Sequence, residues 1–599
     1  MSREASVGPS PVVRALALLG LFAVVLAVYA PSAGFGFIHD DRQLVLRQPM
    51  PASLLEVASV FGEPHWPGLP YYRPVSRSTM VLQKYLHGDD PAPFHRFNVV
   101  LMGLTAWVLF ALLRGRPFRV GFWPAWLAAA AFALHPVASH VVYPICSGRE
   151  TGIPSFLMLC ATLAWLAPGA RAYGVALLFT GLSILAKEQA AVLPALFVWA
   201  DLLGVTAAPP GRDAGRWARR YAPIVALFAI YFVVRTQLFG SALYHVAVFD
   251  RPLQPLLTLV YTLQTAFVPF VALVYEPRLA AWWSWPRFAV TLAAVAALLF
   301  GAWRTTPARR RQLLFFAGWW GVALLPTANL LQQESPFAER YGFLSLAALV
   351  AIVALFVSDA WDAWRGPARR GLAAVCVAAL AALAWISFAR GPGFADEAAF
   401  ATAWVRSDPG SYKAQLNRGQ EYVQVEDWER AAHHLGLAAG LRPGSATILN
   451  GWAYALWRSG DAAAAAQRYE EAIRVAPRLA AARAGYGALL LSEGDARRAA
   501  AQLEQAAQLM PRDAALRLRL GRALRRSGRP EDALRQLEVA TRLDPASVQT
   551  LVELGELLEE QGDMAAARRR YESALALRPD HPRARAGLAR LTAPPRAPR

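Results

Sequence analysis

The chain has 599 residues, of which 56% are hydrophobic and 17% are charged, a composition too apolar for an ordinary soluble protein. A net charge of +19 would favour a nucleic-acid partner in a soluble chain, but here the Arg clusters stand between apolar runs, which indicates membrane topology and no nucleic acid. Arg outnumbers Lys 58 to 3, which together with abundant Ala is typical of a GC-rich bacterial genome. The three cysteines, Cys146, Cys160 and Cys376, have neither disulfide-framework nor metal-ligand spacing.

Residues 1–390 are a series of apolar runs separated by short basic or aromatic loops. A helix needs about 20 apolar residues to cross a bilayer, and tilt or burial within the protein widens that range. Eleven runs are candidate spans: 12–30, 98–113, 120–134, 151–166, 172–186, 190–203, 221–234, 288–303, 313–330, 341–357 and 371–389. The first is not expected to be a signal peptide, because no small-residue cleavage site follows it and ten more apolar runs do.

Positive charge sets the expected orientation of these spans. The densest basic loops are residues 114–116, 212–220, 309–311 and 365–370. All four face the cytoplasm only if the segment from Leu253 to Tyr275, which is apolar but interrupted by Pro269, does not cross the membrane. We therefore expect a re-entrant or interfacial segment there. The C-terminal third then lies outside the cytoplasm of a bacterial inner membrane.

A 34-residue period begins at Pro409. Proline recurs at Pro409, Pro443, Pro477, Pro511, Pro545 and Pro579, and glycine at Gly460, Gly494, Gly528 and Gly562. Alanine recurs at Ala431, Ala465, Ala499, Ala533 and Ala567, and again at Ala438, Ala472, Ala506, Ala540 and Ala574. Small residues where helices touch, glycine at the turn and proline at the exit predict tetratricopeptide (TPR) repeats. The sequence therefore predicts an all-α chain: a membrane domain over 1–390, a linker or leading helix over 391–409, about five repeats over 410–579, and a capping helix with a basic tail over 580–599.

Ligands of such arrays bind the concave face, which the first helix of each repeat lines. Counting along these helices places there Asn450, Tyr454, Trp457, Arg522 and Arg525. These residues are candidates for holding a protein or glycan acceptor, although packing against the neighbouring repeat explains them as well.

Ionisable residues on the outer side of the membrane domain need a reason, because charge near lipid is costly. They are Asp40, Asp41, Arg73, His95, His135, His140, Arg149, Glu150, Lys187, Glu188, Glu339 and Arg340. Groups that simply face water are the expectation for His65, His87, Asp89 and Asp90. The Asp pair and the Lys187–Glu188 pair instead lie within a few residues of membrane depth, which favours a functional role. Lys187 is unusual in a chain that nearly always uses Arg.

This set of residues fits one chemistry in particular. A carboxylate can accept a proton from a hydroxyl, and Arg and Lys can hold a phosphate at the bilayer surface. Together they could transfer a sugar from a lipid-linked phosphate, with the cations stabilising the leaving phosphate. On these residues alone, a transporter or a signalling scaffold fits nearly as well.

Seven short motifs occur in order along the chain. They are Phe-Ile-His-Asp-Asp at 37–41, Tyr-Arg-Pro-Val at 72–75, Phe-His-Arg-Phe-Asn at 94–98, Phe-Ala-Leu-His-Pro at 132–136, Gly-Arg at 148–149, Leu-Ala-Lys-Glu at 185–188 and Glu-Arg-Tyr at 339–341. This series, followed by TPR repeats, resembles the GT-C superfamily of membrane glycosyltransferases. Within it the chain is most similar to the transmembrane and TPR-containing O-mannosyltransferases of animals and their bacterial relatives.

The resemblance implies that the sugar donor is linked to a polyprenyl phosphate and that membrane lipid surrounds the first domain. It implies that Asp40 and Asp41 act as the base, as partners of a divalent cation, or both. It also implies a lipid-phosphate and sugar site made by Arg73, His135, Arg149, Lys187, Glu188 and Arg340. The chain departs from the relatives at His140, where they often have an acidic residue. In addition, Glu150 is not at the position of the relatives' next acidic residue. The sugar and the acceptor could therefore differ.

The sequence thus predicts a membrane glycosyltransferase whose acceptor lies outside the cytoplasm and could be a Ser/Thr hydroxyl of a protein held by the repeats. Two alternatives remain open. One is a non-catalytic membrane scaffold for an envelope or pilus assembly, in which Asp40 and Asp41 would tolerate Asn. The other is a ligase or polymerase of lipid-linked glycans, although such enzymes usually place their functional loop late among the spans.

Overall fold

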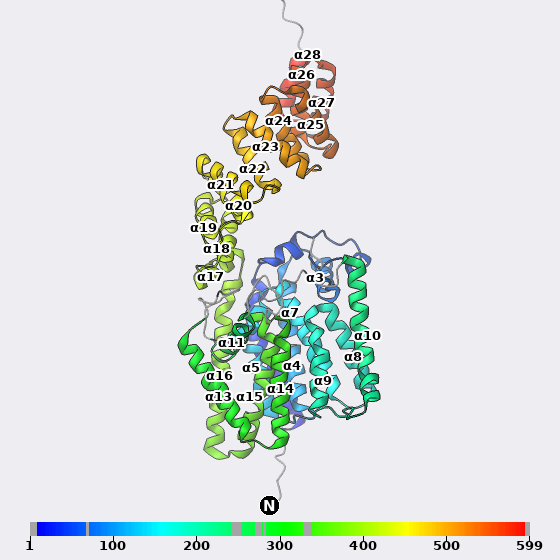
Figure 1. Ribbon diagram of the computed structural model, residues 1–599, viewed down its shortest axis with the longest axis vertical. Coiled ribbons are helices and arrows are strands. Elements are labelled where there is room, and N and C mark those ends of the chain that lie inside the picture. The colour runs from blue at the N-terminus through cyan, green and yellow to red at the C-terminus, as the bar shows by residue number, and fades with distance from the viewer. Residues whose placement is uncertain are drawn as a thin grey trace, which may run out of the picture. The chain divides into compact units, whose positions relative to one another are not determined.

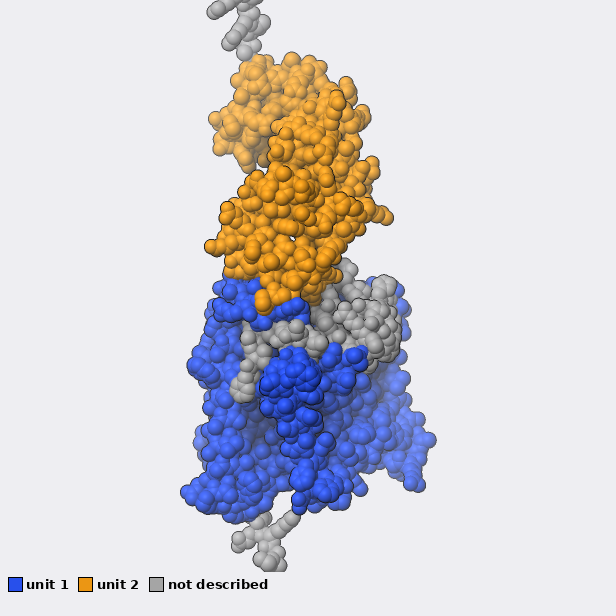
Figure 2. Space-filling model, turned by 60° about the vertical axis from the view of Figure 1, so that its left-hand side comes forward, with its two compact units in different colours: residues 1–408 blue, residues 409–599 orange. Residues whose placement is uncertain are grey.

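The computed structural model describes residues 9–66, 71–240, 253–269, 278, 283–327 and 338–592. Every regular element within these ranges is a helix, which confirms the all-α prediction for the described part of the chain (Figure 1). The chain divides into two compact units, residues 1–408 and residues 409–599 (Figure 2). Residues 391–408 are thus counted with the first unit.

The first unit begins with α1 (Pro11–Tyr29), η1 (Ala30–Gly34), η2 (Arg42–Leu46), α2 (Leu54–Ser59), η3 (Val60–Gly62), α3 (Pro74–His87), α4 (Pro91–Arg114), α5 (Phe122–Leu134) and α6 (Pro136–Val142). It continues with α7 (Cys146–Leu166), α8 (Ala170–Ala186), η4 (Glu188–Val192), α9 (Leu193–Leu202), α10 (Ala214–Phe239), α11 (Gln254–Phe267), α13 (Trp285–Trp303) and α14 (Pro307–Leu324). Its last elements are η5 (Leu325–Thr327), η6 (Glu339–Gly342), α15 (Phe343–Ala363), α16 (Gly366–Arg390), η7 (Gly391–Phe394) and α17 (Glu397–Ser407).

Local sequence explains where several of these helices begin. The side chains of Ser10, Asp90, Asp213 and Thr306 accept hydrogen bonds from backbone N–H groups in the first turns of α1, α4, α10 and α14. Proline also occupies one of the first two positions of α1, α3, α4 and α14, where its missing N–H has no helical partner to lose.

Six helical stretches among the described residues are long and apolar enough to cross a membrane. They are Pro11–Gly34, Pro91–Arg114, Ala214–Phe239, Trp285–Trp303, Glu339–Ala363 and Gly366–Phe394. The pair α5 and α6, bent by 59°, would make a seventh if it is one span. The prediction of a polytopic membrane bundle is therefore supported only in part, because eleven spans were expected.

The difference arises where apolar runs fold into helices that are short or that carry charge. Helix α8 has 17 residues and α9 has 10, and α14 contains three consecutive arginines, 309–311. Helix α7 contains Arg149 and Glu150 near its start and Pro154 further along. Its side chains are nevertheless mostly buried. An apolar run predicts burial, but protein can provide that burial as well as lipid.

Helix α11 covers part of the segment from Leu253 to Tyr275. It has 14 residues and ends at Phe267, shortly before Pro269, so it is too short for a full crossing. Residues 270–275 lie outside the described residues.

The second unit consists of paired helices. They are α18 (Tyr412–Gln424), α19 (Trp428–Leu441), α20 (Ala446–Arg458), α21 (Ala462–Val475), α22 (Ala480–Ser492), α23 (Ala496–Leu509), α24 (Ala514–Arg526), α25 (Pro530–Leu543), α26 (Val548–Glu560), α27 (Met564–Leu577) and α28 (Pro582–Thr592). Five pairs are thus followed by one further helix; the expected tail at 593–599 lies outside the described residues.

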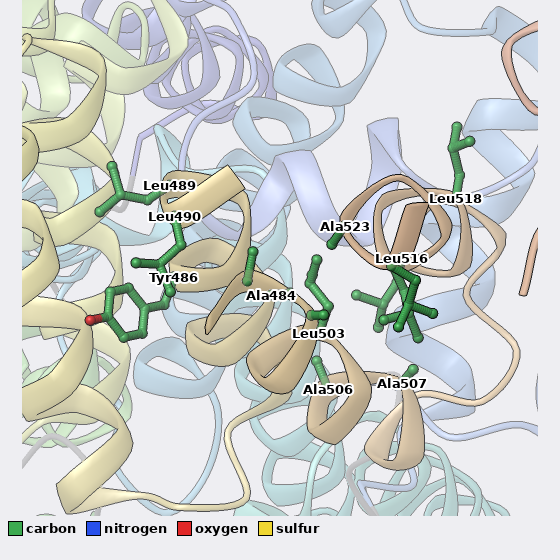
Figure 3. Packing of buried hydrophobic residues seen from close by; sticks show 14 of the residues in the cluster. Ala484, Tyr486, Leu489, Leu490, Leu503, Ala506, Ala507, Leu516, Leu518 and Ala523 are labelled. Carbon is green, nitrogen blue, oxygen red and sulfur yellow. The ribbon is translucent and has the colours of Figure 1, made fainter. Parts of the chain in front are cut away.

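In four of the five helix pairs, a large side chain of the second helix packs against a glycine of the first. A Cβ on Gly487 or Gly521 would lie 2.6–2.7 Å from Leu503 or Leu537, so only glycine leaves room there without a shift. Leu503, Leu516 and Ala523 belong to one buried cluster that passes from repeat to repeat (Figure 3). The 34-residue period of the sequence reflects this stacking of successive repeats.

Candidate functional site

The acidic loop, residues 35–41, follows α1 and η1 and presents two adjacent carboxylates in different surroundings. The side chain of Asp40 is 29% exposed and lies 3.4 Å from Nε2 of His39. Asp41 is buried, and its Oδ1 accepts a hydrogen bond from the backbone N–H of Cys146 at 2.7 Å. Its Oδ2 accepts from the N–H groups of Ile38 and Ile145, both at 3.3 Å. Asp41 therefore satisfies the N-terminus of α7, where a helix presents unpaired N–H groups and partial positive charge.

Burial raises the pKa of Asp41 to about 6, and the hydrogen bonds from Cys146 and Ile38 oppose that shift only in part. Adjacent residues point in different directions, and here one carboxylate is partly exposed while the other holds the loop to α7.

Lys84 on α3 holds the segment that follows the acidic loop. Its Nζ donates hydrogen bonds to the carbonyl oxygens of Val45 at 2.6 Å and Gln48 at 2.7 Å, and it pairs with Asp89 at 3.0 Å. Lys84 was not among the residues expected from the sequence. The rarity of lysine in this chain, which drew attention to Lys187, would have pointed to it as well.

A second group of charged side chains surrounds Arg73, at the start of α3. We call this group the Arg73 network: His65, Arg73, Glu150, Glu188 and Arg235. Nε of Arg73 donates to Glu188 at 2.9 Å, and its Nη1 contacts Glu150. Nε2 of His65 lies 2.6 Å from Glu150, and Arg235 lies 3.9 Å from Glu188. Burial would raise the pKa of Glu150, but Arg73 and His65 outweigh it and hold that pKa well below its usual range.

Two members of this network differ from the sequence expectation. His65 was expected to face water and is instead buried against Glu150, so that expectation was wrong. Arg235 was missed, although it stands directly after the apolar run 221–234.

Lys187 lies between α8 and η4, next to Glu188 of the network. Its ammonium forms no hydrogen bond or ion pair with any residue in the described ranges. Burial and the positive charge of Arg73 lower the pKa of Lys187 to about 8, with a further contribution from Arg340. The half-buried Lys187 ammonium thus interacts with the charges of Arg73 and Arg340, and Glu150 and Glu188 offset these two positive charges in part. An ammonium that lies beside two guanidinium groups is suited to an anionic ligand.

Arg149 and His135, two of the residues predicted for the donor site, are both buried and make hydrogen bonds within the first unit. Nε of Arg149 donates to Asn98 at 3.2 Å and Nη2 to the Phe94 carbonyl at 3.1 Å, and its guanidinium lies 4.5 Å from the Phe97 ring centre. His135 accepts from the N–H of Val137 through Nδ1, which begins α6, and its Nε2 lies 3.1 Å from a carbonyl oxygen of α11.

Further buried charges gather around Glu339. Nη1 of Arg390 lies 2.6 Å from Glu339 and also donates to the Pro136 carbonyl at 3.0 Å. Nε2 of His140 lies 3.5 Å from Glu339. Arg390 and Glu339 thereby join the end of α16 to α6 and η6.

His95 lies elsewhere, with Nε2 at 3.4 Å from the Gly36 carbonyl of the acidic loop.

The described residues contain no group of three or more His, Cys, Asp or Glu placed to hold a metal ion. Both oxygens of Asp41 accept backbone hydrogen bonds, so the two aspartates do not face one another as a chelating pair. The described residues therefore do not fit the divalent cation that the family resemblance implied.

In the second unit, three of the residues expected on the concave face lie on α20. The rings of Tyr454 and Trp457 are 6.2 Å apart, and the Tyr454 ring is also 5.7 Å from Trp428. Arg458 donates to the Tyr454 hydroxyl at 3.0 Å. Asn450 lies on the same helix, half-buried, and its side chain has no hydrogen-bond partner among the described residues.

Arg522 and Arg525 of α24 are held in ion pairs with α26. Arg522 lies 3.0 Å from Glu553, and Arg525 binds Glu556 at 3.1 Å and contacts Glu560. Arg583 of α28 completes a ladder, at 2.6 Å from Glu556. These two arginines are therefore paired with glutamates. The surface around Tyr454 is instead formed mainly by aromatic rings.

Comparisons with known families agree with the period of the second unit. Residues 416–480, 450–514, 490–554 and 548–591 match models described as tetratricopeptide repeat. The C-terminal repeats are TPR repeats. Similar solved structures include MamA 41-end from Desulfovibrio magneticus RS-1, with 22% identity, 28% of this chain and 97% of that chain covered, and a TM-score of 0.27. The TPR protein YrrB has 21% identity over 31% of this chain and 96% of that chain, with a TM-score of 0.28.

One curated relative is also similar to part of this chain. The chain is 29% identical over 134 residues to a protein of Drosophila melanogaster named Protein O-mannosyl-transferase Tmtc1. The match covers 21% of this chain and 15% of that protein.

Proposed function

We propose that this protein is a membrane glycosyltransferase that moves a sugar from a polyprenyl-phosphate-linked donor to an acceptor outside the cytoplasm. The observation that carries the proposal is Lys187, an ammonium without a partner in the described part of the chain, beside the charges of Arg73 and Arg340. The partial match to an O-mannosyltransferase of Drosophila melanogaster and the ordered motifs of the membrane domain support the same function.

In this proposal Asp40 is the base. Its carboxylate is partly exposed, so an acceptor hydroxyl could approach it and give up its proton as the new glycosidic bond forms. The bond between the sugar and the lipid phosphate breaks, and the phosphate leaves with the bonding electrons. Arg73, Lys187 and Arg340 offset the charge that develops on it. Asp41 holds the loop to α7 and does not touch the acceptor.

The acceptor is proposed to be a protein or glycan that the TPR array binds, with the surface around Asn450, Tyr454 and Trp457 as the docking site. Aromatic rings beside an amide suit an extended peptide. The proposal places the enzyme in a bacterial inner membrane with its repeats in the periplasm.

The test measures transfer in membranes supplied with polyprenyl-phosphate-linked sugar. D40N should lower kcat by about 10²–10⁴-fold, because Asn cannot take up the proton. K187M should raise KM for the lipid donor by roughly tenfold, the weight of one charged phosphate contact. The control is D362N, which alters an exposed carboxylate of the same unit.

Full transfer by D40N would rule out Asp40 as the base. Retention of wild-type KM by K187M would rule out the phosphate site. If both variants behave as wild type while removal of the TPR array abolishes function in cells, the chain is a scaffold.

A further inference from the structure

The acidic loop is bound by the helix that precedes the repeats. The N–H of Gly36 donates to the carbonyl of Ala395 at 2.7 Å, and the N–H of His39 donates to Oε2 of Glu397 at 2.5 Å. Glu397 is the first residue of α17, 358 positions from His39 along the chain. A carboxylate on a backbone N–H is a charge-assisted hydrogen bond, stronger than one between neutral groups.

His39 needs this support because of its backbone conformation. Its φ is 45°, in the left-handed region of backbone conformation that residues other than glycine rarely adopt. The His39 ring also packs on α17, with its centre 5.9 Å from that of Phe400 and 6.0 Å from that of Trp404. Both aromatic residues are buried, so α17 presents a firm surface to the loop.

The turn at His39 determines where the next residue, Asp40, projects. Asp41 fixes the other side of the same turn through α7. A loop held from both sides keeps Asp40 in one position, and a base acts efficiently only when it is held within hydrogen-bond reach of its proton.

We propose that Glu397 is a positioning residue, which holds His39 in its left-handed conformation and thereby places the Asp40 carboxylate. This inference rests on the proposed role of Asp40 as base. It makes α17 a part of the catalytic unit, although in sequence it looks like a connection to the repeats.

The activity test is a double-mutant cycle in the full-length protein. E397A should lower kcat roughly tenfold with KM for the lipid donor unchanged, because the donor site is intact and the base is displaced. E397Q should retain most activity, because its amide oxygen still accepts from the His39 N–H. In an H39G background the effect of E397A should shrink to about twofold or less, since glycine adopts the positive φ without support. The matched control is E429A, an exposed first-turn glutamate of α19.

A second measurement does not depend on transfer. D40C is labelled with a membrane-impermeant maleimide, with the unsubstituted protein as the blank for its three native cysteines. The labelling rate should change at least about threefold when E397A is added, and the change should be smaller with E397Q, since accessibility reports the loop's position.

The outcomes separate the two proposals. Wild-type kcat in E397A with an unchanged D40C labelling rate would overturn the positioning role, as would an equal loss of kcat from E397A with and without the H39G substitution. If D40N itself retains transfer, the proposed base is wrong, yet a labelling rate that responds to E397A would still assign the position of the loop to Glu397. Should E397A fail to reach the membrane, E397Q and the H39G/E397A pair decide the question.

Discussion

Asp40 and Asp41 show how far two identical neighbouring residues can differ. Asp40 keeps 29% of its side chain exposed, whereas Asp41 exchanges water for three backbone N–H groups. Those hydrogen bonds favour the ionised form, but the loss of water outweighs them. The sequence could identify the pair, because its position after the first apolar run is visible. It could not say which carboxylate is buried, since that depends on the start of α7, more than a hundred residues away.

The buried carboxylate predicts a pH dependence of stability. The pKa of Asp41 is about 6 in the folded protein and 3.8 in an unfolded chain, so the folded state holds the proton more tightly. Its contribution to the free energy of unfolding is therefore fully present below about pH 4 and is lost as the pH rises through about 6, by roughly 3 kcal/mol. Thermal unfolding between about pH 4 and pH 6.5 should show a smaller decline in D41N than in wild type. Parallel curves for the two proteins would contradict the assignment.

At the scale of the element, the TPR helices depend on small residues facing large ones. A Cβ on Gly521 would lie 2.7 Å from Cγ of Leu537, which is a branch point and cannot swing aside freely. Gly451 also stands inside a first helix, yet a Cβ there would lie 3.9 Å from Leu435, an ordinary contact. The same residue type therefore serves packing at one position and not at the other.

These two glycines predict opposite effects of one substitution. G521A should destabilise the repeats by about 1–2 kcal/mol, because overpacking outweighs the better helix propensity of alanine. G451A should stabilise them by up to about 1 kcal/mol, because only the propensity changes. Chemical unfolding of the full-length protein, followed at the repeats, measures both. A loss of stability in G451A equal to that in G521A would refute the packing explanation.

At the scale of the whole molecule, the two units differ in how much their sequence reveals. TPR contacts join neighbouring repeats, so a period of 34 residues exposes the fold directly. The Arg73 network joins residues separated by as many as 115 positions, and no local pattern reports which of them meet. The motifs did bring Arg73, Lys187, Glu188 and Arg340 into consideration. Glu397 carries no sequence signal at all, because its role depends on the conformation of a residue at the other end of the first unit.

The whole chain also carries a prediction about sidedness. If all four dense basic loops face the cytoplasm, an odd number of crossings precedes the repeats, and the repeats should lie outside the cytoplasm. Alkaline phosphatase fused after residue 599 should be active and a fluorescent protein there dark. Fusions after Arg370, in a basic loop expected inside, should give the opposite pattern. Inactive phosphatase at residue 599 would refute the orientation, and the segment from Leu253 to Tyr275 would be the first place to look.

The ladder of ion pairs from α24 through α26 to α28 gives the TPR array two ends of different physical character. Arg525, Glu556 and Arg583 join successive repeats at the surface, where dissolved ions screen the attraction. Around Tyr454 the contacts are between rings, together with a hydrogen bond from Arg458 to a neutral hydroxyl, and salt affects these contacts less than it affects an ion pair. In a linear array each repeat contacts only its neighbours, so one interface between repeats can open while the others stay formed. Raising the ionic strength should therefore speed amide hydrogen exchange in α26 and α28 and leave α20 unchanged, so that the solenoid loosens from its C-terminal end while the surface proposed for the acceptor stays closed.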